Sequence, residues 1–75
     1  MARDPSTARF AMVISRYHDD VEYYQWTDGP TVASRWAAHA IRTIRDLETC
    51  VIFDRTKNAR FSLQGFRELY LNRKG

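Results

Sequence analysis

Cysteine is almost missing from this sequence, and its scarcity narrows the expected cellular setting. Cys50 has no second cysteine with which to form an internal disulfide. Small secreted domains usually depend on disulfides, whereas a small domain without them is typical of a reducing compartment. The sequence also lacks an apolar run long enough to span a bilayer, and its first residues, with Arg3 and Asp4, lack the apolar segment of a signal peptide. We therefore expect a cytoplasmic protein with no membrane partner.

Motifs that carry chemistry are missing as well. There is no Gly-rich phosphate loop, no G-x-S-x-G, no Cys-His constellation and no pair of carboxylates in an apolar setting. His18, Asp19, Asp20 and Glu22 do cluster, but turn residues often gather without a metal, and no second His or Cys lies at a zinc-like spacing. Cys50 begins an apolar stretch and is expected to be a small buried hydrophobe rather than a nucleophile. We expect no enzyme, no cofactor and no metal site.

Apolar residues, in contrast, are abundant enough for a folded domain. They make up 44% of the 75 residues and include four Phe, four Tyr and two Trp. At this length one small core is expected, and no internal repeat or linker divides the chain. Residues 1–8 contain Pro5, Ser6 and Thr7 without apolar periodicity, so they are predicted to be a flexible lead-in. Residues 9–75 are predicted to form a single α+β domain.

Residues 30–46, PTVASRWAAHAIRTIRD, form the long segment with the strongest helical pattern, and the other predicted elements surround it. At about 100° per residue one side is apolar and the other is polar. The predicted inner side comprises Val32, Ala33, Trp36, Ala37, Ala40, Ile41 and Ile44. The predicted outer side comprises Arg35, His39, Arg42, Arg45 and Asp46. Asp28 or Thr31 is expected to cap a helix that ends near Leu47, and Trp36 is expected to anchor it in the core.

Strand-like segments lie before and after this helix. They are residues 9–17, residues 21–27, residues 50–54 and a segment that begins at Ala59 or Arg60. Polar turns separate the members of each pair, and Asn58 in the second turn tolerates the left-handed backbone conformation that such a turn often needs. The predicted order is hairpin, helix, hairpin.

The segment after residue 60 fits two periodicities, one of a strand and one of a strand followed by a short helix. In the helical alternative Leu63, Phe66, Leu69 and Tyr70 meet at spacings of three, three and one. Gly65 favours a bend between two strand segments, so β structure is predicted here, with residues 72–75 frayed and basic. The fold class is therefore α+β, a two-layer ββαββ sandwich with one helix packed on an antiparallel sheet of four or five strands.

The aromatic residues are too many for one face of a small sheet. The set predicted to pack under the helix with Trp36 comprises Phe10, Met12, Ile14, Tyr24, Trp26, Phe53, Phe61 and Leu63. The opposite parity leaves Val13, Tyr17, Val21, Tyr23, Ile52, Phe66 and Tyr70. Tyr17, Tyr23, Phe66 and Tyr70 are therefore candidates for an exposed aromatic interface, either within a homodimer or for another molecule. The alternative is scattered exposed aromatics without a function.

Positive charge is concentrated in the second half of the sequence. Residues 31–75 hold nine Lys or Arg against four Asp or Glu, and ten of the twelve cations of the whole chain are Arg. The candidate binding residues for a partner or a phosphate are Arg35, His39, Arg42, Arg45, Arg55, Lys57 and Arg60. A solvated helix face is the alternative for the first four, since Arg42 and Asp46 also form an ordinary i, i+4 pair.

Three functions fit these features. The first is a non-enzymatic module that occupies a surface of a larger host protein or nucleoprotein. The second is a small nucleic-acid-binding protein, since aromatics interleaved with Arg bind single strands by stacking, although the signature of the RNA-recognition motif is absent. The third is a structural homodimer. The ββαββ order with the TVASRWAAHAIRTI helix resembles small single-domain inhibitors that phages encode, including some anti-CRISPR proteins, and this resemblance implies binding to a host nucleoprotein or enzyme and blocking its site.

Overall fold

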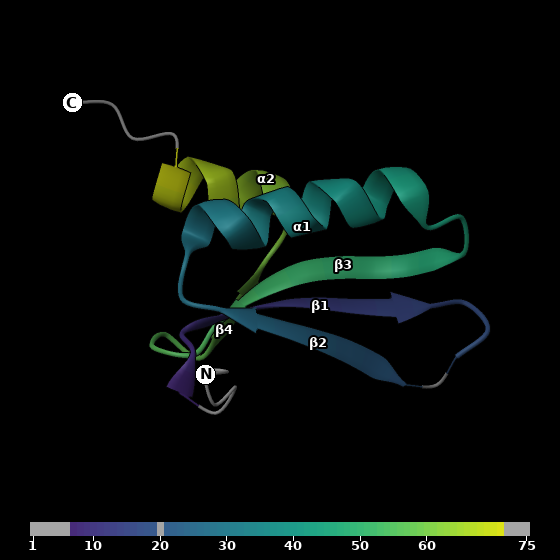
Figure 1. Cartoon of the computed structure of the whole chain (residues 1–75), viewed down its shortest axis with the longest axis horizontal. Helices are drawn as coiled ribbons and strands as arrows, with labels where there is room; N and C mark the ends of the chain where they lie inside the picture. Colours follow the sequence, from purple (N-terminus) through teal and green to yellow (C-terminus); the bar gives the residue numbers. More distant parts are fainter. Residues whose placement is uncertain (1–6, 20, 72–75) are drawn as a thin grey trace, which may run out of the picture.

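The chain folds into a four-stranded antiparallel sheet with helices packed on one side, which confirms the predicted α+β class (Figure 1). The computed structural model describes residues 7–19 and 21–71. The elements in order are β1 (Phe10–Arg16), β2 (Glu22–Thr27), α1 (Pro30–Thr43), β3 (Leu47–Asp54), β4 (Ala59–Phe61), α2 (Leu63–Phe66) and η2 (Arg67–Leu71), a π-type helical segment that follows α2. The helix α1 lies along the strands, with α2 beside it.

The strand order in the sheet is β2-β1-β3-β4, so β1 and β3 form its centre. β1 is antiparallel to both neighbours, and Met12 lies opposite Gln25 on β2 and Ile52 on β3. β2 and β3 therefore run in the same direction on either side of β1, and α1 connects them over one face. The short strand β4 pairs only with the end of β3. Since side chains alternate along each strand, one parity faces the helices and the other faces away.

The helix α1 begins directly after Gly29, which is still extended, and Pro30 supplies a backbone already suited to the first helical turn. The predicted caps are wrong. No side chain caps the helix, and the Asp28 carboxylate instead accepts a hydrogen bond from the Arg9 amide at 3.0 Å. The predicted end near Leu47 is also wrong, because Leu47 already pairs with Arg16 as the first residue of β3.

Large side chains from the sheet and the last helix fill the core, whereas α1 contributes small ones. Phe10, Ile52 and Phe66 are fully buried, and Phe66 meets Phe10 edge to face with ring centroids 5.4 Å apart. The buried residues of α1 are Ala33, Ser34, Ala37 and Ala40. These small side chains let the helix backbone lie close to the sheet.

The predicted inner side of α1 is therefore only partly right. Trp36 is half-buried and packs against the edge of the core rather than its centre. Val32 and Ile41 were expected inside but are 39% and 49% exposed. The buried stripe is narrower than the sequence pattern, and it includes Ser34, whose hydroxyl accepts a hydrogen bond from Arg67 at 3.2 Å.

The segment after β4 is helical, so the prediction of a second strand segment there is wrong. Ser62 caps the new helix, because its hydroxyl accepts a hydrogen bond from the Gly65 amide at 3.1 Å. Leu63, Phe66 and Tyr70 then face the core at helical spacing. Gly65 sits inside the first turn instead of at a strand bend, and burial of these three side chains outweighs the weak helix propensity of glycine.

The cap on α2 gives a first testable prediction. Ser62→Ala is expected to lower the free energy of unfolding by about 1 kcal/mol, because the Gly65 amide loses its acceptor. Urea denaturation of the two proteins measures the difference. Thr31→Ala is the matched control, since Thr31 is exposed in the first turn of α1 and its side chain caps nothing. Equal losses in both variants would contradict a specific cap at Ser62.

The two ends of the described chain bear on two further predictions. Ala8 was expected in a flexible lead-in, but it is buried, and its carbonyl accepts a hydrogen bond from Arg55 at 2.8 Å. Residues 1–6 and 72–75, predicted to be flexible and frayed, lie outside the described residues.

The predicted left-handed residue is confirmed, since Asn58 has a φ of 52° in the loop before β4. No helix within residues 7–19 and 21–71 is long and apolar enough to cross a membrane.

Candidate functional site

The face of the sheet turned away from the helices carries three large aromatic residues. Tyr24 and Trp26 lie on β2, and Phe53 lies on β3. Trp26 and Phe53 are both register partners of Ala11, one on each side of β1, and their rings meet edge to face with centroids 6.1 Å apart. Tyr24 stacks on Trp26 with a centroid distance of 6.0 Å and an interplanar angle of 13°.

The middle strand under these rings has small side chains. Ala11 is 0% exposed and Val13 is 1% exposed, although none of the described helices covers this side of the sheet. Ala11 is flanked by Trp26 and Phe53, and Val13 is flanked by Tyr24 and Val51, from the two neighbouring strands. The aromatic layer thus forms a second, shallow apolar cluster that is open to solvent on its outer side.

Two arginines lie on this aromatic layer. The guanidinium carbon of Arg55 is 4.3 Å from the centroid of the Trp26 ring, a cation–π contact. Arg60 donates hydrogen bonds to the Glu22 carboxylate at 3.1 Å and to the Tyr24 hydroxyl at 3.1 Å. Hydrogen bonds from Arg60 and Tyr24 lower the pKa of Glu22, so this carboxylate remains charged at neutral pH.

A hollow of about 440 Å³ lies between these groups, and it is lined by Tyr24, Trp26, Phe53, Asn58 and Arg60. We call the surface formed by Tyr24, Trp26, Phe53, Arg55, Asn58 and Arg60 the open face. Its rings offer apolar contact and its arginines are held against the rings and the Tyr24 hydroxyl, so the open face can bind a protein surface that carries apolar groups.

The predicted assignment of aromatics to faces is wrong for β2 and β3. Tyr24, Trp26 and Phe53 were expected under the helix but lie on the open face. Conversely, Phe66 was expected outside and is fully buried, and Tyr70 packs against the same core. Ile52 is buried on the helix side for the same reason, because a one-residue shift in parity exchanges the two faces of a strand.

Two of the predicted interface aromatics are exposed. Tyr17 is 68% exposed in the turn after β1. Tyr23 is 46% exposed, and its hydroxyl donates a hydrogen bond to Asp19 at 3.0 Å. Tyr23 pairs with Ile14 and so lies on the helix side of β2. Neither belongs to the open face, so the predicted set of four does not form one surface.

The two predicted basic groups lie on different sides of the sheet. Arg35, His39 and Arg42 are exposed along α1, as predicted, and Arg45 is exposed in the turn that follows. Arg55 and Arg60 belong to the open face on the other side. Lys57 lies apart from both, with its Nζ 5.1 Å from the centroid of the Tyr70 ring. No single ligand of small size can contact both groups.

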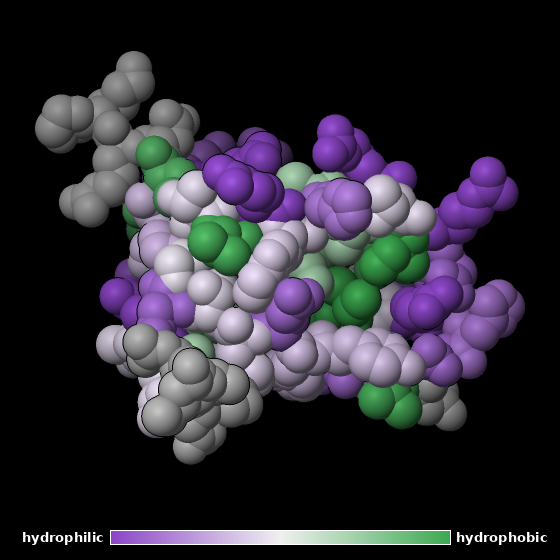
Figure 2. Space-filling view, in the orientation of Figure 1, coloured by the Kyte–Doolittle hydropathy of each residue, from purple (hydrophilic) through white to green (hydrophobic). Residues whose placement is uncertain are grey.

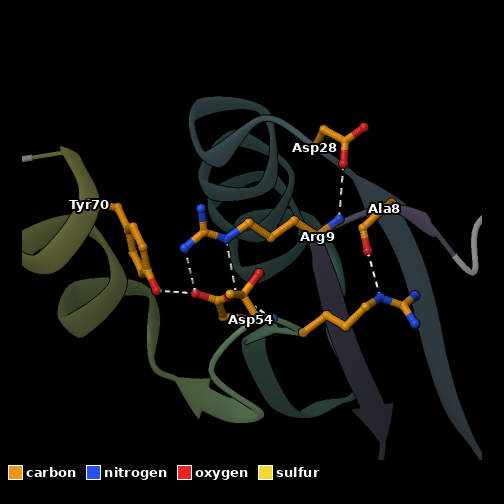
Figure 3. Close-up of polar contacts among 7 residues, drawn as sticks. Ala8, Arg9, Asp28, Asp54 and Tyr70 are labelled. Atoms are coloured by element: carbon orange, nitrogen blue, oxygen red, sulfur yellow. Dashed lines mark hydrogen bonds and ion pairs between the residues drawn. The ribbon is translucent and has the colours of Figure 1, made fainter.

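A buried polar cluster at one end of the sheet was not predicted (Figure 3). The fully buried Asp54 carboxylate accepts two hydrogen bonds from the Arg9 guanidinium at 3.2 Å, one from the Thr56 amide at 2.9 Å and one from the Tyr70 hydroxyl. Burial raises the pKa of Asp54, but these hydrogen bonds outweigh it and bring the pKa below its ordinary value. The sequence signal that could have indicated it is an aspartate at the end of the apolar run CVIFD.

This cluster has the properties of a structural tie rather than of a reactive site. Burial and the hydrogen bond to Asp54 raise the pKa of Tyr70, so its hydroxyl stays protonated and keeps donating. The Arg9 guanidinium also lies 4.8 Å from the centroid of the Phe10 ring. The cluster joins residues near both ends of the described chain to the end of β3, and every buried side-chain polar atom in the described residues has a hydrogen-bond partner.

Comparison with known proteins gives no match. No family model, no curated protein and no solved structure is significantly similar to the chain. Function is therefore argued from the surfaces described above.

Groups with catalytic or metal-binding potential are few. Within residues 7–19 and 21–71, no three His, Cys, Asp or Glu side chains gather closely enough to hold a metal ion. The Cys50 side chain is partly buried on the helix side, and burial raises the pKa of its thiol, so the nucleophilic thiolate is disfavoured.

Proposed function

We propose that the chain is a small non-enzymatic binding module that occupies a surface of a larger protein through its open face. The observation that carries this proposal is the gathering of Tyr24, Trp26, Arg55 and Arg60 on the side of the sheet opposite the described helices. Tyrosine, tryptophan and arginine are the residue types most enriched among the energetically dominant positions of protein interfaces. Their side chains are already ordered by stacking and hydrogen bonding, which lowers the entropy lost on binding.

Features of the same face favour a protein over a nucleic acid. A base that stacks on Trp26 would have to displace either Tyr24 or the Arg55 guanidinium, since both already lie against that ring. The cation nearest the hollow, Arg60, is paired with Glu22, whose charge repels phosphate. Single-strand binders instead leave aromatic faces free beside unpaired cations. Nucleic-acid binding is the alternative, and titration with DNA and RNA at two salt concentrations tests it, because phosphate contacts make affinity strongly salt-dependent.

Occupation of a partner's surface is also how an inhibitor without catalytic groups acts. The resemblance in element order to small phage-encoded inhibitors adds to this proposal the idea that the partner is a host enzyme or nucleoprotein whose site becomes blocked. The experiment below identifies the partner and so shows whether it is a host enzyme or a nucleoprotein.

The experiment compares capture by the parent protein with capture by two variants. The tagged full chain is incubated with a nuclease-treated lysate of the cells that make it, and retained proteins are identified after washing at high salt. Tyr24→Ala combined with Arg60→Ala is expected to reduce capture of the partner at least tenfold, because it removes an aromatic and an arginine anchor. Arg45→Ala is the control, since Arg45 is exposed outside the open face and its replacement removes one positive charge, as the replacement of Arg60 does.

Two results would contradict the proposal. One is the absence of any protein that survives the high-salt wash. The other is equal capture by the double variant and the Arg45→Ala control. Light scattering of the free chain tests the third function, a structural homodimer, since a stable dimer whose formation depends on Tyr24 and Arg60 would mean that the open face binds a second copy.

A further inference from the structure

A second surface, on the helix side of the molecule, combines a free strand edge with an apolar groove. In the described part of the chain β2 pairs with β1 alone, so its outer edge has backbone N–H and C=O groups without strand partners. Four consecutive residues of this strand, residues 22–25, are exposed. A free edge of this kind can accept an extended peptide as an additional strand.

The groove lies between α1 and the neighbouring strands β1 and β2. It has a volume of about 550 Å³ and is lined by Met12, Ile14, Gln25, Arg35, Trp36, His39, Ala40, Thr43 and Ile44. Figure 2 shows the hollow on the face in view, with hydrophobic atoms exposed between the helix and the edge of the sheet. Ala40 has the smallest side chain in this lining, and Trp36 and Ile44 lie one turn before and one turn after it. The groove therefore has the most room for an apolar side chain beside Ala40, where the side chain of the helix is smallest.

The rim of this groove carries one positive charge, that of Arg35, beside the hydrogen-bonding imidazole of His39. Arg35 and His39 belong to the lining, and no Asp or Glu does. Neither side chain makes a hydrogen bond or an ion pair with another described residue, so both are available to a ligand. Charge complementarity therefore favours a ligand with carboxylates over a neutral or basic one.

The spacing of the helix matches that of an extended peptide. Residues four apart on a helix rise by about 6 Å, and alternate residues of a strand are about 6.6 to 6.8 Å apart. Because α1 lies along the strands, successive helix-side residues of an added strand would meet successive turns of α1 (Figure 1). A large side chain at Ala40 and an acidic one a turn away, near Arg35, are thus compatible with one peptide.

We propose that this groove binds an extended acidic segment of another protein, which adds to the edge of β2, places one large apolar side chain over Ala40 and sets carboxylates against Arg35 and His39. The site is separate from the open face, so it gives the chain a second binding function beyond the one proposed above. The occupant is a peptide segment rather than a second copy, because the helix-side residues of β2, which are Tyr23, Gln25 and Thr27, include no carboxylate for Arg35.

The test uses synthetic peptides of about eight residues, long enough to cover β2. The probe has a central Leu, Glu two positions to either side of it, Thr elsewhere and capped ends. Chemical shifts of the isotope-labelled full chain are followed during titration. We expect saturable shifts of β2 amides and of groove residues. Replacing both Glu by Lys, or N-methylating alternate amides of the probe on its strand edge, is expected to weaken binding at least tenfold.

Variants of the chain separate the site from general charge attraction. Arg35→Glu is expected to weaken binding of the Glu probe about tenfold, whereas Arg45→Glu, an equal charge change outside the groove, should alter it less than about twofold. Arg60→Ala, a change of the open face that lies on β4 and outside the groove, should bind the probe as the parent does, so failure of the groove and failure of the open face are told apart. Three results would overturn the inference: no binding of the Glu probe, equal losses for Arg35→Glu and Arg45→Glu, or a β2-paired dimer that excludes the probe.

Discussion

Replacing Phe66 with alanine is expected to lower the free energy of unfolding by about 3 to 5 kcal/mol. The Phe66 ring is fully buried, with centroids 5.4 Å from Phe10, 6.4 Å from Phe61 and 4.5 Å from Tyr70. Alanine leaves a cavity at the junction of the sheet and the last helix, and the buried side chains of α1 are too short to fill it. For a chain of 75 residues the total stability is roughly 4 to 11 kcal/mol, so the variant should be largely or completely unfolded near physiological temperature.

Thermal and urea denaturation, followed by circular dichroism, measure this loss. Leu69→Ala is the matched control, because Leu69 lies on the same helical segment but is 45% exposed, and its loss should stay below about 1 kcal/mol. A Phe66→Ala protein as stable as the control would mean that the last helical segment does not dock on the sheet.

Asp54→Asn is expected to cost about 2 to 4 kcal/mol at neutral pH. The side chain keeps its volume but loses its charge, and its amide group presents donors where Arg9 and Tyr70 also donate. The loss is smaller than for a fully enclosed ion pair, because the Arg9 side chain is 42% exposed and can be rehydrated. The expected first consequence is weaker attachment of residues 7–9 and of η2 to the sheet.

The same residue sets an acid dependence whose sign follows from its lowered pKa. Stability contributed by the ionised Asp54 is fully present above the ordinary pKa of an aspartate, about 3.9, and is lost as the pH falls through the lower pKa of the folded state. The difference in unfolding free energy between the parent and Asp54→Asn should therefore shrink on acidification below about pH 4. Urea denaturation across this range measures it. Asp46→Asn is the control, since its partner Arg16 is 45% exposed, and a larger effect of this variant at neutral pH would contradict the role assigned to Asp54.

The start of the helix and the loop before β4 were predictable because they depend on local backbone chemistry. Gly29 and Pro30 mark the start of α1, and Asn58 adopts the left-handed conformation in its loop. The exposure of Arg35, His39 and Arg42 also followed from the sequence, because charged side chains at helical spacing stay in water. The order of strands and helix along the chain followed from these local signals, and that order predicts a helix layer packed on a sheet.

The faces of the strands were not predictable in the same way. β2 has large rings at both parities, Tyr23 on one and Tyr24 and Trp26 on the other, and the run Val51 to Phe53 is apolar at every position. Alternation therefore carried no information on which side is inside. The register with β1, which comes from distant parts of the chain, decides it. The composition of the open face thus depended on tertiary pairing rather than on local pattern.

The last segment shows a different limit. Gly65 by itself favours a bend between two strand segments. Ser62, three residues earlier, is however a good helix cap, and Leu63, Phe66 and Tyr70 have helical spacing. The decisive contribution is the burial of Phe66 and Tyr70 against Phe10, a residue from the other end of the described chain. Long-range packing of this kind cannot be weighed from a single local window.

The pairing of β1 with β3 determines when this protein can fold during its synthesis. Phe10 is made early, but it meets Asp54 in the sheet and Phe66 in the core only after most of the described chain has been added. Until then the β1–β2 hairpin is an isolated pair of strands, which is marginal in water, and its helix-side residues Met12 and Ile14 have nothing to cover them. A released chain that ends before Phe66 should therefore expose these apolar residues to chaperones, whereas the chain that includes Tyr70 should bury them in one cooperative step.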